Sequence, residues 1–163
     1  MTTVTFTVLG RPAPGGSKQP FIDRAGRPRV REDAKRGKPW RDSVAAAAVE
    51  AMRGREPKSG PLMLDVTFYV ARPSTHFGSG RNRERVRPSA PYFPAVRPDV
   101  TKLVRALEDA LTHIVWRDDA QVVIQIANKR YGTPERAVVT VQGVSAWPPR
   151  NGERDVLAED AAA

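Results

Sequence analysis

Alternating hydrophobic and polar residues predict four β-strands in this chain. The first is the clearest, because Val4, Phe6 and Val8 share one face and threonines occupy the other, as in a half-buried strand. A turn around residues 132–134 joins the last two strands. The predicted strands are residues 3–9, 61–71, 121–127 and 137–142.

Hydrophobic residues at helical spacing, together with start and stop residues, predict two helices. Residues 40–53 contain good helix formers, and Gly54 is a natural stop. The second helix begins near Pro98 or Asp99, which are good helix-start residues, and runs to about His113. Its apolar face comprises Leu103, Val104, Leu107, Leu111 and Ile114. Its polar face comprises Asp99, Lys102, Arg105 and Asp109.

These elements predict a mixed α/β fold of the α+β type, with a small mixed sheet packed against two main helices. A chain of 163 residues fits a single domain, which we place at residues 1–144. Two segments rich in Pro, Gly and basic residues separate the elements. Residues 10–39 predict a loop or a hairpin, and residues 72–97 predict an extended basic loop. Residues 145–163 have the composition of a disordered tail.

The charge balance points to a phosphate-rich partner. The formal net charge is +9 and the pI is near 10.6, which favours nucleic acid. The chain has no cysteine and two histidines, so a bound metal would be held mainly by oxygen, as Mg²⁺ or Mn²⁺ prefers. No signal peptide or membrane span is recognisable, and we expect a soluble, cytoplasmic protein.

Two acidic clusters lie about one helix apart between residues 97 and 123. Asp99 stands at a helix start, and Asp118 and Asp119 precede a strand, so we expect them to converge on one cleft. Carboxylates that hold a metal are what phosphodiester hydrolysis requires. Lys102 and Arg105 could then contact a phosphate or stabilise the charge that develops on it. This pattern predicts a metal-dependent nuclease.

Each of these features also has a structural interpretation. Asp99 fits an N-cap, the Asp-Asp pair fits a turn, and a basic stripe fits a solvated helix face; spacing alone favours these roles. His113 fits a helix end better than a metal ligand. Trp40 and Trp116 fit core anchors better than platforms for bases. Tyr92 and Phe93 fit either role, because aromatic residues among arginines can stack on unpaired bases.

The stretch RPDVTKLVRALEDALTHIVWRDDAQVV, residues 97–123, resembles the hallmark of the RusA-type Holliday junction resolvases of phages and prophages. Two earlier segments are also similar to that family: WRDSV at residues 40–44 and GRPAPGGSK at residues 10–18. The resemblance spans about residues 3–144. The matching positions are Pro98, Asp99, Leu103, Asp109, Ala110, Leu111, Trp116, Asp118, Asp119, Gln121 and Val122.

The resemblance implies a small α/β homodimer with two active sites. It also implies that the dimer depends on magnesium and makes paired nicks across a four-way DNA junction. It makes Asp99 and Asp119 catalytic acids and puts Arg105 where the family has an essential lysine. Thr101 replaces the family's second aspartate, and Lys102 replaces an asparagine. Two readings remain open. Either Asp99 and Asp119, with Asp118 or Asp109, hold the metal while Thr101 contributes a hydroxyl or holds a water, or the chain is a weakened or inactive member that binds junctions.

The basic segments supply the predicted DNA contacts. We expect residues 81–87 to be extended, so that their alternating arginines share one face along a junction arm. A non-catalytic DNA-binding module and a basic structural protein remain alternatives to the nuclease. The predicted DNA-binding residues are Lys18, Arg29, Arg31, Arg81, Arg83, Arg85, Arg87 and Lys102.

Overall fold

The protein is described by a computed structural model that covers residues 3–15, 18–32 and 37–144. The predicted tail at residues 145–163 lies outside the described residues. No helix in the described ranges is long and apolar enough to cross a membrane.

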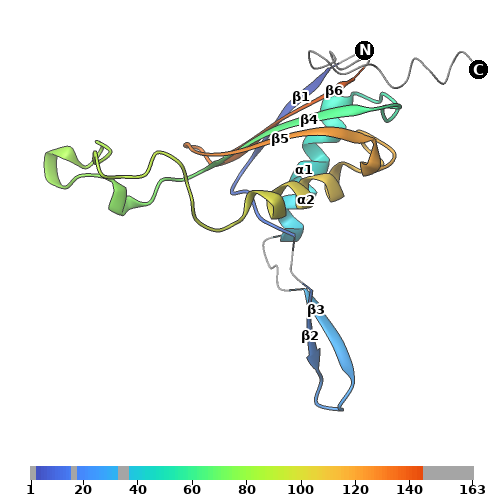
Figure 1. The fold of residues 1–163 in the computed structure, drawn as a ribbon, viewed down its shortest axis with the longest axis horizontal. Helices are drawn as coiled ribbons and strands as arrows, with labels where there is room; N and C mark the ends of the chain where they lie inside the picture. The colour runs from blue at the N-terminus through green and yellow to red at the C-terminus, as the bar shows by residue number, and fades with distance from the viewer. Residues whose placement is uncertain (1–2, 16–17, 33–36, 145–163) are drawn as a thin grey trace, which may run out of the picture.

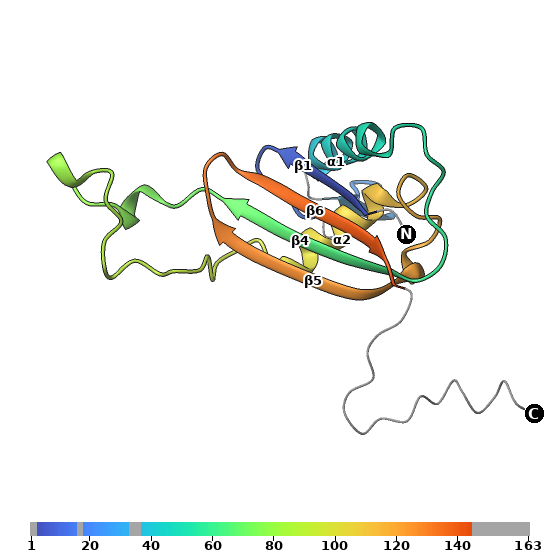
Figure 2. The same cartoon turned by 90° about the horizontal axis from the view of Figure 1, so that it is seen from above.

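A four-stranded sheet in the order β1-β6-β4-β5 forms the centre of the fold (Figures 1 and 2). β4 and β5 are parallel, whereas β6 is antiparallel to both β1 and β4, so the sheet is mixed. All four predicted strands are confirmed, although β5 continues to Tyr131, past its predicted end. The strands are β1 (Val4–Leu9), β4 (Leu62–Val70), β5 (Val122–Tyr131) and β6 (Arg136–Gly143).

Two helices, α1 (Gly37–Met52) and α2 (Val100–Leu111), cover one face of the sheet. α1 lies under β1 and α2 under β5, and the two helices also contact each other. The predicted apolar residues that fall within α2, Leu103, Val104, Leu107 and Leu111, are buried. The mixed sheet packed with two helices confirms the predicted fold class. Trp40 and Trp116 lie in the core, as the structural interpretation predicted.

Two polar side chains of β5 reach α2 and the segment before it. Gln125 donates a hydrogen bond to Glu108 of α2, and the Nζ of Lys129 donates to backbone oxygens that precede α2. Ile126 is 43% exposed, because the alternation of the strand turns it to the opposite side of the sheet. The edge strand beside α2 therefore contributes two polar contacts to the helix and the segment before it.

Residues 10–39 contain a hairpin of two antiparallel strands, β2 (Lys18–Ile22) and β3 (Pro28–Glu32). The carboxylate of Asp23 accepts hydrogen bonds from the backbone of Ala25 and Arg27 and so fixes the turn. Figure 1 shows the hairpin projecting away from the sheet and helices. The predicted hairpin is confirmed.

The basic loop between β4 and α2 forms an arm beyond the end of β4 (Figure 2). Our expectation of an extended chain at residues 81–87 is wrong, because residues 80–82 form a 3-10 turn, η2 (Gly80–Asn82). The loop then folds back, with Gly78 donating to Arg85 and Arg87 donating to His76 through the backbone. A Cβ on Gly78 would lie 2.6 Å from the carbonyl oxygen of Asn82, so this close approach requires glycine.

Candidate active site

Asp99 occupies the N-cap position of α2 but does not cap it. Its side chain makes no capping hydrogen bond, and its carboxylate lies 3.5 Å from the Nζ of Lys102. The side chain is exposed, and the backbone oxygen accepts a hydrogen bond from Leu103. The interpretation of Asp99 as only a helix cap is therefore wrong, and its carboxylate is accessible to a ligand.

Lys129 braces the chain that leads into Asp99. Its Nζ donates to the carbonyl oxygens of Val96 and Pro98, the latter over 2.8 Å. A lysine on β5 therefore fixes the start of α2 and adds a positive charge near it. Lys129 was not predicted from the sequence as a site residue. The alternation of β5 places Lys129 on the face turned towards the helices. A lysine is uncommon at such a position unless its charge has a partner, and this could have identified it.

Asp118 and Asp119 lie at the other end of α2, around a short 3-10 turn, η3 (Asp119–Gln121). The carboxylate of Asp118 accepts a hydrogen bond from Ala120, and Gln121 completes a reciprocal capping box. Gln121 also donates to the carbonyl oxygen of Lys58. The turn interpretation is thus confirmed for Asp118, whereas Asp119 is exposed at the first position of η3.

Glu108 joins the acidic end of α2. Partial burial raises the pKa of its carboxyl, the hydrogen bond from Gln125 lowers it, and the nearby carboxylates of Asp119 and Asp109 raise it further. These interactions place Asp119 close to the last turns of α2. Glu108 was not predicted from the sequence as a site residue, because it lies at the border between the polar and apolar faces of the helix.

An open pocket of about 420 Å³ lies at this acidic end. His113 lines the pocket and follows the helix with φ 68°, a left-handed conformation common just after a helix end. The interpretation of His113 as a helix-end residue is therefore confirmed. The residues that line the pocket are Asp109, Thr112, His113, Arg117, Asp118 and Asp119.

The expected convergence of Asp99 with Asp119 in one cleft is wrong within a single chain. α2 and β5 run in opposite directions and are joined at the C-terminal end of the helix (Figure 1). Asp99 therefore lies at one end of α2 and Asp119 at the other, about 14 Å apart along the axis, judged from the nine-residue step between Asp99 and Glu108. The described residues contain no group of three or more His, Cys, Asp or Glu that could hold a metal ion.

The exposed face of α2 changes its charge along its length. Lys102 and Arg105 are exposed in the first half, as the predicted polar face requires, and Thr101 is exposed as well. Glu108 and Asp109 follow in the second half, next to Asp119. One end of the helix is thus mainly basic around a single aspartate, and the other end is acidic.

The sequence matches the family model described as Endodeoxyribonuclease RusA over residues 12–142, which is most of the chain. The chain belongs to the RusA family. A relative from Bacillus subtilis (strain 168), described as Uncharacterized protein YqaN, is 32% identical over 146 residues, which span 90% of this chain and 100% of that protein. The family predicted from the motif is confirmed.

The RusA match includes the hairpin, the arm, α2 and η3. It therefore contains both predicted catalytic acids, Asp99 and Asp119, together with Arg105. The roles of these residues in catalysis, metal binding and DNA binding stay predictions.

The arm presents arginines and aromatic side chains to solvent. Arg81, Arg83 and Arg85 are exposed, and the guanidinium of Arg87 donates to the carbonyl oxygen of Phe77. Tyr92 and Phe93 are 75% and 56% exposed and pack edge to face. Lys18, Arg29 and Arg31 lie on the strands of the hairpin. Two projecting elements of a RusA-family chain therefore carry seven of the eight predicted DNA-binding residues, and the eighth, Lys102, lies on α2.

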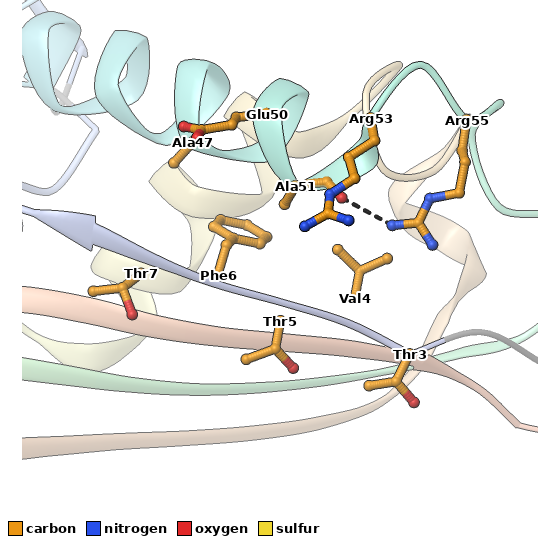
Figure 3. Close-up of a pocket in the computed structure, with 10 residues that line it drawn as sticks. All are labelled: Thr3, Val4, Thr5, Phe6, Thr7, Ala47, Glu50, Ala51, Arg53 and Arg55. Carbon is orange, nitrogen blue, oxygen red and sulfur yellow. Dashed lines mark hydrogen bonds between the residues drawn. The ribbon is translucent and has the colours of Figure 1, made fainter.

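A second groove of about 720 Å³ lies between β1 and α1, at the opposite edge of the sheet from β5 (Figure 3). Arg53 and Arg55 line it, but Arg55 is occupied by hydrogen bonds to the last carbonyl oxygens of α1. Glu50 adds an acidic side chain to the lining of the groove. None of the residues predicted for catalysis, metal binding or DNA binding lines this groove.

Proposed function

We propose that this protein is an endodeoxyribonuclease that cuts phosphodiester bonds in four-way junctions and other branched DNA. The observation that carries this proposal is the RusA family match, which spans the hairpin, the arm and both acidic positions. The exposed carboxylates of Asp99 and Asp119 support it, because neither carboxylate accepts a capping hydrogen bond in the described residues.

We also propose that Mg²⁺, with Mn²⁺ as a substitute, is the cofactor. Oxygen ligands from Asp99 and Asp119 suit such hard cations. One chain, however, does not fit a metal that both residues share, because α2 separates them. The hydrogen bond from Ala120 engages one oxygen of Asp118, and the second oxygen is not used by this cap.

The test is the cleavage of a labelled four-way junction and of a linear duplex with the same arm sequences, across a titration of MgCl₂ and MnCl₂. We expect metal-dependent products from the junction, little product from the duplex, and none in excess EDTA. Equal cleavage of both substrates would contradict the preference for branched DNA.

A junction-binding module with weakened or lost catalysis is the second candidate. The observation that favours it is Thr101, which stands in the first turn of α2 where the resembling motif has an aspartate. A hydroxyl in place of a carboxylate removes one charge and one hard ligand next to Asp99.

Thr101→Asp separates these two candidates. We expect about tenfold faster junction cleavage at limiting Mg²⁺, because the added carboxylate strengthens metal binding near Asp99. The measurement is the initial nicking rate as a function of Mg²⁺ concentration, with Thr7→Asp as a control that adds the same charge at an exposed threonine of β1, at the opposite edge of the sheet from β5. A rate unchanged at every Mg²⁺ concentration would show that Thr101 does not stand in for a ligand.

The arginines of the arm are expected to contact DNA phosphates. Replacing Arg81, Arg83, Arg85 and Arg87 together with alanine removes four cations, and should reduce the slope of log Kd against log salt by roughly 3–4. Junction affinity measured by fluorescence anisotropy between 50 and 200 mM salt, about the range in which such contacts are screened, gives this slope. The control replaces Arg53 and Arg55 with alanine, because these two arginines lie beside β1 and not on the arm. An unchanged slope would mean that the arm is only solvated.

A further inference from the structure

Tyr92 and Phe93 form an exposed aromatic pair on the basic arm. Both rings are more than half exposed, and they pack edge to face with their centroids 4.7 Å apart. Edge-to-face packing covers only one face of one ring, so the pair keeps ring faces on which another flat group can stack. The pair is therefore an available stacking surface.

The chain on either side of the pair is held in place. Arg72 donates from Nη1 to the carbonyl oxygen of Pro91 over 2.8 Å, and its guanidinium lies over the ring of Tyr131, 4.1 Å from the centroid. On the other side of the pair, Pro94 is buried and lines a small cavity at the root of the arm together with Tyr131. The two rings thus lie between fixed points, and ordering them on a ligand costs little conformational entropy.

The aromatic pair lies on the segment of the arm that leads into α2 (Figure 2). Phe93 comes six positions before Asp99, so the two residues are at most about 21 Å apart, which is about six nucleotide steps along one DNA strand. Lys129 donates to the carbonyl oxygens of Val96 and Pro98 and so ties this segment to β5. A base that stacks on the pair would therefore be held at a set distance from Asp99.

Cations flank the pair on the side of Asp99. Arg97 is exposed, and the exposed Arg11 lines the cavity at the root of the arm, although its Nε also lies 3.9 Å from the carboxylate of Glu135. Positive charge beside aromatic rings suits unpaired nucleotides, because the cations contact phosphates while the rings stack on bases. A protein partner fits less well, since two rings bury at most about 500 Å² and a stable protein interface needs roughly 1,000 Å² or more.

Branched DNA exposes base faces that a linear duplex hides. Within a linear duplex each base is stacked on both sides, and a side chain can reach a base face only by paying to open the stack. This cost is smallest where pairing or stacking is already interrupted, as at a branch point. A stacking surface therefore distinguishes the two forms of DNA, whereas arginines that contact phosphates do not.

From these contacts we propose that Tyr92 and Phe93 stack on bases at the branch point and so give the protein a preference for branched over linear DNA. The proposal rests on the proposed function, because it takes branched DNA as the substrate. The arginines of the arm supply affinity for any DNA, and the aromatic pair supplies the discrimination.

The test compares the binding of a four-way junction and of a linear duplex by fluorescence anisotropy in EDTA. Tyr92→Ala/Phe93→Ala should weaken junction binding about tenfold, the scale of stacking on one base, and change duplex binding by less than about twofold. Tyr92→Phe keeps the ring and should stay within about twofold of wild type on both DNAs. The control is Val49→Ala, which removes an apolar side chain that is 58% exposed on α1 and should change neither affinity.

A photo-cross-link tests the contact independently of affinity. 5-Iododeoxyuridine next to the branch point should cross-link to Tyr92 or Phe93 on irradiation, as identified by mass spectrometry, and the same base about ten base pairs along an arm should not. Circular dichroism should show every variant folded. Equal loss of affinity for junction and duplex in the double variant, no loss for either, or cross-links only to other residues would overturn the proposal.

Failure of the nuclease function has a different signature. If the wild type prefers the junction in EDTA but does not cut it at any metal concentration, the proposed function fails, and the double variant still tests the stacking surface. If the wild type cuts the junction and the double variant keeps its full preference for it, the function stands and the stacking surface is wrong.

Discussion

Asp119→Asn should reduce junction nicking by at least about 100-fold, which is the scale for removing one group that stabilises charge in a transition state. Asp119 is exposed beside the pocket at the end of α2, and no cap or ion pair of the described residues uses its carboxylate. Asparagine keeps the size of the side chain but loses the charge. The measurement is the initial nicking rate on a four-way junction at saturating Mg²⁺.

Asp42→Asn is the control for this change. Asp42 is an exposed aspartate on α1 and pairs with Lys38 at 2.9 Å, so the variant loses the same charge away from α2. We expect its nicking rate to stay within about twofold of wild type, because surface substitutions of this kind have small effects. A rate for Asp119→Asn equal to that of Asp42→Asn would remove Asp119 from the active site.

Trp116→Ala should lower the free energy of unfolding by about 3–5 kcal/mol, the usual range for removing a large core aromatic side chain. Trp116 is fully buried, and its indole Nε1 donates to the hydroxyl of Thr112 over 3.3 Å. Its backbone oxygen accepts from His113, so the residue fixes the link between α2 and η3. Urea unfolding followed by circular dichroism measures the change.

Tyr92→Ala serves as the comparison for the core substitution. Tyr92 is 75% exposed on the arm, and we expect a change in unfolding free energy below about 0.5 kcal/mol. If Trp116→Ala cost as little as Tyr92→Ala, the tryptophan would not be the core anchor that the structure shows.

Periodicity predicted the main elements because their buried faces are continuous. The strand at residues 3–9 and the helix from Asp99 onward were predicted from side chains that are buried in the structure. The arm was different, since its conformation depends on Gly78 and on backbone hydrogen bonds between residues distant in the loop. The alternating arginines of residues 81–87 do not predict such turns.

The sequence predicted the residues of the candidate site but not the distance between them. The motif contains Asp99 and Asp119, and both carboxylates are accessible. Their separation depends on the direction of β5 relative to α2, which follows from the parallel pairing of β5 with β4. Glu108 and Lys129 were missed for a related reason, because their roles arise from contacts between α2, β5 and the preceding loop.

Cleavage of branched DNA by this RusA-family chain is best tested by mapping the cut positions on all four strands of a synthetic junction in Mg²⁺. We expect nicks on two opposing strands at equal distances from the branch point, all lost in EDTA. Tight, salt-sensitive junction binding with no cleavage at any concentration of Mg²⁺ or Mn²⁺ would contradict it and identify a DNA-binding module instead.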